Sequence, residues 1–279
     1  MPEEVPLTGA GGSRQRPVVS LLTDFGSSEP FVGLVKARIL GCCPDAAIVD
    51  LTHELSPFAI EAAAFWIARA FSYFPAGSVH VCVVDPGVGT ARRILLVEHA
   101  GQYFLAPDNG LLTDIADGEG ATVRAVDLRV PERWGLGPPS ATFHGRDLFA
   151  PLAGRLADGS IGPEELGRPV QDWLRLDRLP VEISPSRIQG RILFADRFGN
   201  LFSNIELVSP VHSTEWQVYA GGRAVPWVRT YGNGTPGSLV ALENAFGVLE
   251  IACVHGSAAL ALGSGPGTQV ELRRLEAPG

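Results

Sequence analysis

The chain has 279 residues, of which 46% are hydrophobic and 19% charged, values that fit a folded globular protein and exclude a disordered one. Its formal net charge of -8 argues against a nucleic-acid or anionic-membrane partner, because such partners are held mainly through Lys and Arg. The length fits one large or two moderate domains, and we expect two.

The N-terminus and the cysteines indicate where the protein works. Residues 1–16 are rich in Gly, Pro and charge without the apolar stretch of a secretory signal, so we expect a disordered tail. The cysteines form no CxxC pair, and a disulfide between the adjacent Cys42 and Cys43 would be strained, which favours a reducing compartment. The apolar run 62–71 contains Arg69 and is too short to span a bilayer. We therefore predict a cytoplasmic protein with no membrane partner.

The first half of the chain alternates between strand and helix signals. Apolar spacing predicts one helix over 31–40, and Ser56-Pro57, an N-cap followed by a first-turn proline, predicts another through about Phe71. Short aliphatic and β-branched runs predict strands over 18–22, 46–51, 78–84, 94–98 and 103–106. The pattern predicts an α/β N-terminal domain over residues 17–160 with a mostly parallel sheet.

The second half has a different texture. Residues 161–185 carry Gly, Pro and charge without sustained periodicity, which is typical of a linker between domains. Short apolar runs then follow between Gly, Asn and Pro, at 188–194, 216–220, 238–242 and 248–254. These runs predict a smaller all-β C-terminal domain over 186–275, shaped as a barrel or a sandwich.

Two carboxylates stand at the ends of predicted strands. Asp24 closes the first strand and Asp85 the strand that starts near Ser78, and each precedes a turn that contains glycine. In a parallel α/β sheet, ligands bind beyond the carboxyl ends of the strands, so both are candidates for a functional site. An aspartate in such a place can also simply cap a turn, and it is the pair together with further polar motifs that favours function.

Other kinds of site can be weighed from the same residues. The segment 87–90, Gly-Val-Gly-Thr, lacks the Gly-Lys-Ser/Thr ending of a phosphate-binding loop, which excludes an ATPase of that type. His144 by itself could be a core or capping residue. Asp24, Asp85, His144 and Asp147 could in principle hold a metal ion, but no compact HxH or HExxH spacing supports it. We predict neither a metal nor a cofactor.

Taken together, several segments resemble one family, the S-adenosylmethionine hydroxide adenosyltransferases, which are relatives of the bacterial fluorinase and chlorinase. The segments are Thr23–Gly26, Val84–Thr90, Pro107–Leu112, Phe143–Asp147 and Asp196–Asn200. The resemblance spans the chain from about Val18 to about Glu271. It implies a hydrolase that splits S-adenosyl-L-methionine into adenosine and L-methionine by in-line attack of water or hydroxide on C5′. It also implies a homotrimer whose active sites lie between subunits.

The resemblance assigns the nucleoside pocket. Asp24 matches the carboxylate that holds both ribose hydroxyls, which suits two donors on one acceptor. Phe198 and Asn200 match residues at the adenine, and Phe58 matches an aromatic residue against the nucleoside. Plain core packing is the alternative for either phenylalanine. Phe143 and Gly145, in the motif around His144, are also assigned to substrate binding.

The residues that would bind the methionine part of the substrate depart from the family pattern. Asp196 matches the acid that receives the methionine ammonium group. Halogenating relatives hold the carboxylate through a Ser-Arg pair, whereas this chain has Asn244-Ala245-Phe246-Gly247 with no arginine. The carboxylate would then be held by Asn244 or by backbone amides. Adenosine binding is therefore a firmer expectation than methionine binding.

For the chemistry, Asp85, Arg92 and His144 match the residues that distinguish the water-using members of the family. The three would bind one water, favour its hydroxide-like form and manage its proton, in an order that the sequence does not reveal. Arg93 is the alternative to Arg92, although the step of seven residues from Asp85 favours Arg92. Arg92 could also be a solvated surface charge.

Two other functions stay open. Gly145 resembles a glycine of the chlorinase, so a halogenase is one alternative, although a carboxylate at Asp85 would repel a halide by roughly 4 kcal/mol at about 4 Å. The other alternative is a protein that binds adenosine or S-adenosylmethionine without turnover. Such a sensor has no evident need for Asp85, Arg92 and His144 beside the reacting carbon.

Overall fold

The computed structural model describes residues 16–128, 137–178, 180–207 and 215–275. The chain divides into two compact units, residues 1–176 and 177–279, which are described separately below. The division falls within the segment expected to be a linker, 161–185. The predicted tail, 1–16, lies outside the described residues apart from Arg16, whose Nε donates to the Asp45 carbonyl over 2.7 Å.

The first unit is built on a mixed sheet with the strand order β2-β1-β3-β5-β4-β6. Its strands are β1 (Val18–Thr23), β2 (Ala47–Thr52), β3 (Val79–Val83), β4 (Ile94–His99), β5 (Gln102–Pro107) and β6 (Thr122–Ala125). The pairs β1–β2, β1–β3 and β3–β5 are parallel, whereas β4 runs antiparallel to both β5 and β6. The predicted α/β domain with a mostly parallel sheet is confirmed.

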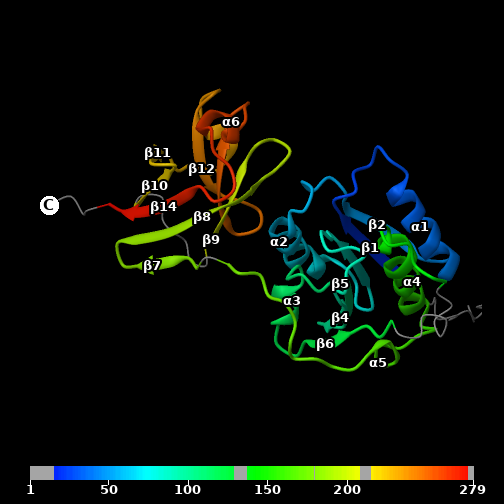
Figure 1. Ribbon diagram of the computed structural model, residues 1–279. Helices are drawn as coiled ribbons and strands as arrows, with labels where there is room; N and C mark the ends of the chain where they lie inside the picture. Colours follow the sequence, from blue (N-terminus) through cyan, green and yellow to red (C-terminus); the bar gives the residue numbers. More distant parts are fainter. Residues whose placement is uncertain (1–15, 129–136, 179, 208–214, 276–279) are drawn as a thin grey trace, which may run out of the picture. The chain divides into compact units, whose positions relative to one another are not determined.

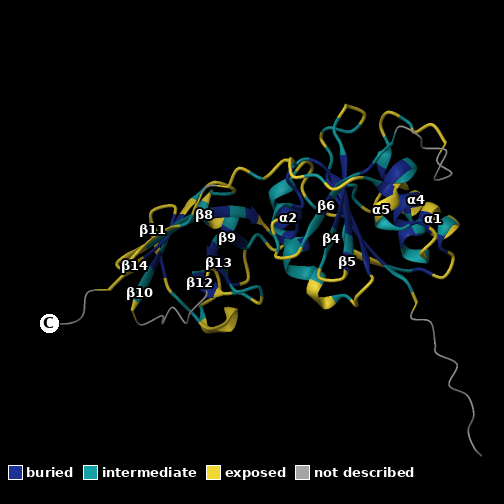
Figure 2. Ribbon diagram, turned by 90° about the horizontal axis from the view of Figure 1, so that it is seen from below, coloured by how far each residue is buried: buried dark blue, intermediate teal, exposed yellow. Residues whose placement is uncertain are grey.

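Helices cover both faces of this sheet (Figure 1). They are α1 (Phe31–Cys42), α2 (Ile60–Ala70), the 3-10 turn η1 (Phe71–Tyr73), α3 (Thr113–Ala116), the π-type turn η3 (Gly145–Phe149), α4 (Ala150–Asp158) and α5 (Pro163–Leu166). Because side chains alternate along a strand, Val19 and Leu21 of β1 pack with α1 and α4, while Leu22 packs with α2. Figure 2 shows the central strands as the buried part of the unit.

The predicted start of the second helix is wrong. Helix α2 begins at Ile60, not at Pro57, and its cap residue is Ala59. Phe58 has a φ of 67°, in the left-handed region that a helix cannot contain. Its backbone N–H donates to Asp24 Oδ2 over 2.9 Å. This contact with the residue that follows β1 outweighs the local helix-start signal of Ser56-Pro57.

A polar network crosses the core of the first unit at His80, which is fully buried. His80 Nε2 donates to Gln102 Oε1 and Nδ1 accepts from Ser20 Oγ, both over 2.6 Å, and the ring stacks on Phe104 with centroids 4.7 Å apart. Burial lowers the pKa of His80 to about 4. The neutral ring therefore satisfies both of its neighbours without carrying a charge into the core.

The lowered pKa of His80 predicts how the stability of the fold depends on pH. The unfolded chain binds a proton at His80 near pH 6.5, whereas the folded chain binds it only near pH 4. The contribution of neutral His80 to the free energy of unfolding is therefore fully present above pH 6.5 and decreases as the pH falls from 6.5 to 4. We expect His80→Gln to remove about 2 to 3 kcal/mol of the difference in unfolding free energy between pH 7.5 and pH 4.5. Urea unfolding at both pH values measures it, with the exposed His255→Gln as control. An unchanged pH dependence in His80→Gln would contradict the prediction.

The second unit is an antiparallel sheet that nearly closes into a barrel, as predicted. Its strands are β7 (Glu182–Ser184), β8 (Arg187–Ala195), β9 (Leu201–Glu206), β10 (Trp216–Ala220), β11 (Arg223–Val225), β12 (Leu239–Glu243), β13 (Val248–Cys253) and β14 (Gln269–Arg274), with the 3-10 turn η4 (Tyr231–Asn233) and helix α6 (Ala258–Leu262). The order is β11-β10-β14-β8-β9-β13-β12, with β7 beside β8. Backbone hydrogen bonds from Ala241 to Pro226 and from Val228 to Ala241 join the two ends of this order.

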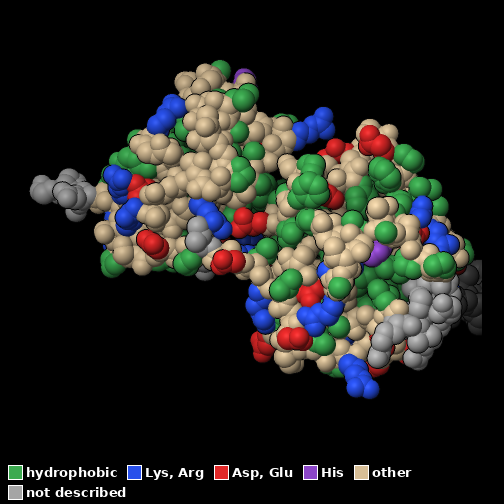
Figure 3. All heavy atoms as spheres, in the orientation of Figure 1, with side chains coloured by type: hydrophobic (Ala, Val, Ile, Leu, Met, Phe, Trp, Pro, Cys, Tyr) green, Lys and Arg blue, Asp and Glu red, His purple; other side chains and the backbone are tan. Residues whose placement is uncertain are grey.

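Among the described residues, no helix is both long and apolar enough to cross a membrane. On the face drawn in Figure 3, acidic and basic side chains are interspersed and form no continuous basic patch. The four cysteines are all free.

Candidate active site

Three neighbouring strands of the first unit end at the same edge of the sheet, and each is followed by a polar residue. Asp24 follows β1, Asp85 comes two residues after β3, and Asn109 comes two residues after β5. Register places Thr23 beside Val83 on parallel strands, so the residues that follow leave the sheet together. The predicted strand-end carboxylates thus lie where α/β sheets bind ligands.

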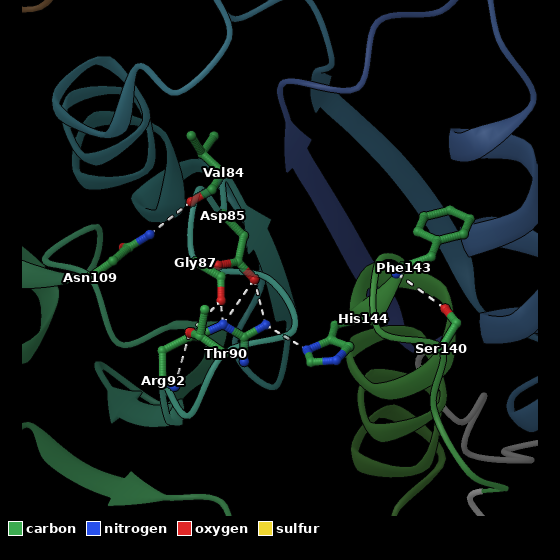
Figure 4. A network of polar contacts seen from close by, with 9 residues as sticks. All are labelled: Val84, Asp85, Gly87, Thr90, Arg92, Asn109, Ser140, Phe143 and His144. Atoms are coloured by element: carbon green, nitrogen blue, oxygen red, sulfur yellow. Dashed lines mark hydrogen bonds and ion pairs between the residues drawn. The ribbon is translucent and has the colours of Figure 1, made fainter.

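Asp85, Arg92 and His144 form one connected group (Figure 4). Arg92 Nε donates to both oxygens of Asp85, over 3.1 and 2.9 Å, and Nη2 also donates to Asp85 Oδ2. Nη2 lies 2.8 Å from His144 Nδ1. The side chains of Arg92 and Asp85 are only 10% and 5% exposed, so Arg92 is not a solvated surface charge.

The arginine fixes the protonation of the histidine. A guanidinium group only donates, so His144 Nδ1 must accept, and the neutral ring carries its proton on Nε2. Burial and the positive charge of Arg92 lower the pKa of His144, against the weaker opposing influence of Asp85 and Asp147. At neutral pH the group therefore presents an imidazole N–H donor and a carboxylate acceptor.

Close backbone packing brings the loop 85–92 to the segment that carries His144. Gly89 has a φ of 78°, and a Cβ placed there would lie 2.2 Å from the Ala141 carbonyl oxygen. Directly after His144, the π-type turn η3 leads into α4, and a Cβ on Gly145 would lie 3.1 Å from the Phe25 ring. A larger residue at Gly89 or Gly145 would require the Ala141 backbone or the Phe25 ring to shift.

Arg93 has different partners from Arg92. Its Nε donates to Asp108 Oδ2 over 2.8 Å, Nη1 donates to Asp172 Oδ1 over 3.2 Å, and Nη2 reaches the Asp172 carbonyl. The structure therefore places Arg92, and not Arg93, with Asp85 and His144.

The assigned nucleoside residues of the first unit are exposed or lie at the edge of the core. Asp24 holds the backbone at Phe58, a residue that is 68% exposed and so is not packed in the core. The ring of Phe143 packs edge-on against Phe25 and Phe31, with centroids 5.9 and 5.4 Å away. Asp24 and Phe58 are thus coupled directly, whereas Phe143 supports the segment around His144.

Asp147 forms its hydrogen bonds with residues other than Asp85, Arg92 and His144. It accepts from the backbone and side chain of Ser140 and from Arg146, which together hold the pKa of its carboxyl well below the ordinary range. The fourth residue weighed for a metal site therefore has other partners. In the described part of the chain, no group of three or more His, Cys, Asp or Glu is placed to hold a metal ion.

In the second unit, Asp196, Phe198 and Asn200 share the turn between β8 and β9. Asp196 Oδ1 accepts from the backbone N–H of Phe198 and Asn200, over 2.9 and 2.8 Å, and Oδ2 accepts from Asn200 Nδ2 over 3.1 Å. Phe198 is 74% exposed, so core packing does not explain it either. The Asp196 carboxylate builds the turn that presents the Phe198 ring.

Asn244 belongs to a second turn, between β12 and β13. Its Oδ1 accepts from the backbone of Phe246 and Val248, over 2.9 and 3.3 Å. Its Nδ2 donates over 3.2 Å to Glu250, a buried carboxylate that also accepts from Tyr231 over 2.7 Å. Glu250 and Tyr231 carry no signal in the sequence, since each stands in an ordinary apolar or loop run.

Known protein families match the two units separately. Family models described as the SAM hydroxide adenosyltransferase N-terminal and C-terminal domains match residues 19–167 and 190–271. A Thermus thermophilus protein named (R)-S-adenosyl-L-methionine hydrolase is 42% identical over 92% of this chain and 99% of its own length. A Nocardia brasiliensis fluorinase is 30% identical over 68% of this chain and 72% of its own. The crystal structure of an uncharacterized conserved protein from Thermotoga maritima has a TM-score of 0.82, with 33% identity, 92% of this chain and all of that chain covered.

Proposed function

This chain belongs to the SAM hydroxide adenosyltransferase family, and from that premise we propose that it hydrolyses S-adenosyl-L-methionine to adenosine and L-methionine. The observation that carries the proposal is the joined Asp85, Arg92 and His144 group at the carboxyl edge of the sheet. The relatives with the broad match are named hydrolases, whereas the fluorinases match less of the chain. Those names specify the R form at sulfur, so we propose the same epimer as substrate.

The roles of the three residues follow from their hydrogen bonds. A water oxygen attacks C5′ from the side opposite the sulfonium, the C5′–S bond breaks, and its electron pair leaves with the sulfur of methionine. His144 Nε2–H donates to the water and orients it, because its other nitrogen is held by Arg92. Asp85 accepts the water proton, since a carboxylate keeps acceptor capacity beyond its bonds to Arg92. Arg92 stabilises negative charge on the attacking oxygen.

Product analysis tests the reaction. Purified protein is incubated with each epimer of S-adenosylmethionine, and we expect equimolar adenosine and methionine from the R epimer, at an unchanged rate in the presence of a chelator. Formation of 5′-chloroadenosine in chloride would instead identify a halogenase. Binding of the substrate with no adenosine released would identify a sensor. Loss of activity in chelator would identify a metallohydrolase.

His144 predicts how the activity depends on pH. Because protonation of Nδ1 would set two donors against each other, only the neutral ring keeps its bond to Arg92. The pKa of His144 is lowered, so kcat/KM should stay level above about pH 6.5 and fall only at lower pH. A pH profile of kcat/KM measures this. Activity that declines already between pH 8 and pH 7 would contradict a neutral, Arg92-bound histidine.

The remaining assignments belong to the same proposal. Asp24 and Phe58 would hold the ribose and the base, with Phe198 and Asn200 at the adenine and Asp196 and Asn244 at the methionine end. The homotrimer and the cytoplasmic location stay predictions, and light scattering of the purified protein would check the first of them.

A further inference from the structure

We propose that Asp108 and Asn109 are positioning residues that hold both ends of the loop carrying Asp85 and Arg92. The inference rests on the proposed function, which leaves the segment Pro107–Leu112 without a role. These two residues follow β5 at the same edge of the sheet as Asp24 and Asp85.

Asn109 holds the first end of the loop (Figure 4). Its Nδ2 donates over 2.8 Å to the carbonyl of Val84, the residue directly before Asp85. Its Oδ1 accepts from the backbone of Leu111 over 3.2 Å, which fixes the orientation of the amide. The backbone thus enters the loop at a position set by β5.

Asp108 holds the second end. It is 5% exposed, and its Oδ2 accepts from Arg93, the residue directly after Arg92, while its backbone N–H donates to the Arg93 carbonyl over 3.0 Å. Its Oδ1 accepts from the backbone of Leu174 over 2.8 Å. The carboxylate is therefore fixed from two sides, and Arg93 is drawn away from His144.

One dipeptide thereby fixes the backbone on either side of the reacting group. Arg92 contacts Asp85 within the same loop and His144 on a segment that is distant in the sequence. Both contacts depend on the positions of the two ends of the loop. A displacement of about 1 Å in such a group can lower turnover by up to about 100-fold. Loosening either end should lower kcat more than it weakens substrate binding.

The test uses Asn109→Ala, which removes the side-chain bond at the first end, and Arg93→Lys, which weakens the side-chain contacts at the second end, and neither adds or removes a charge. The matched control is Arg124→Lys, because Arg124 of β6 binds Glu98 and the Gly167 carbonyl, which lie outside the loop. Steady-state kinetics give kcat and KM. NMR titration of His144 in the absence of substrate gives a readout that needs no turnover, with Arg92, Asp85 and Asp147 as the charges that face the ring.

In Asn109→Ala and Arg93→Lys we expect kcat to fall about 10-fold or more with KM changed less than about threefold. The His144 titration should move up toward its ordinary range as Arg92 loosens, and neither quantity should change in Arg124→Lys. The proposal is overturned if both variants match Arg124→Lys, or if kcat falls while the His144 titration stays in place. Should Asn109→Ala fail to fold, Arg93→Lys alone decides. If the wild type does not hydrolyse S-adenosylmethionine, the proposed function fails while the titration still tests the positioning.

Discussion

Replacing His144 or Asp85 by alanine is expected to lower kcat by about 100-fold to 10,000-fold, the usual range for removing a general acid or base. His144→Ala removes the donor that orients the water, and Asp85→Ala removes the proton acceptor and leaves Arg92 without its counter-charge. Adenosine does not require either group, so its dissociation constant should change less than about threefold. Turnover assays and calorimetric titration with adenosine measure the two effects.

The control for these variants is Asp117→Ala. Asp117 pairs with Arg175 over 2.9 Å in an exposed ion pair, so its removal should leave kcat and adenosine binding unchanged. If His144→Ala or Asp85→Ala weakened adenosine binding as much as turnover, the roles assigned to the two residues would be wrong. Such a result would show that they hold the nucleoside and do not act on the water.

Gly89→Ala is expected to lower kcat by about 100-fold, because it forces the loop away from the segment that carries His144. A Cβ at this position would lie 2.2 Å from the Ala141 carbonyl oxygen, a rigid backbone atom that cannot rotate aside. The positive φ adds a conformational cost of about 1 kcal/mol. Kinetics together with thermal unfolding separate the displacement from a loss of stability.

Gly120→Ala is the matched control for this effect. Gly120 also has a positive φ, 75°, but a Cβ there would meet nothing within 4 Å. Both variants therefore have a similar conformational cost from the positive φ, and only Gly89→Ala is expected to displace the loop. Equal kcat in the two variants would show that the Gly89 contact does not position Arg92 toward His144.

Much of the fold could be predicted because its signals are local. The run Val18–Leu22 predicts β1, and the apolar spacing after Pro30 predicts α1, since alternation and helical spacing depend only on neighbouring residues. The Ser56-Pro57 signal failed for the opposite reason. A hydrogen bond from Phe58 to Asp24, 34 residues away, sets the backbone there, and no local pattern encodes it.

The candidate site divides in the same way. Asp24 and Asp85 could be found from their places at strand ends, and the motif segments could be found from their order along the chain. The choice between Arg92 and Arg93 depends on where each side chain points, which adjacent positions in a sequence do not reveal. The role of Asn109 likewise appears only with its bond to Val84, and Glu250 only through its burial with Asn244 and Tyr231.

The sequence by itself determined the α/β and all-β units, the family resemblance and the residue types of the proposed chemistry. Tertiary structure decided that Asp85, Arg92 and His144 form one group, that burial and Arg92 favour a neutral His144 with its proton on Nε2, and that Asp108 and Asn109 hold the loop. The physical reason is distance along the chain. Arg92 and His144 stand 52 residues apart, so contacts that exist only in the folded chain, such as the packing of Gly89 against Ala141 and of Arg92 over the Phe149 ring, bring their side chains together.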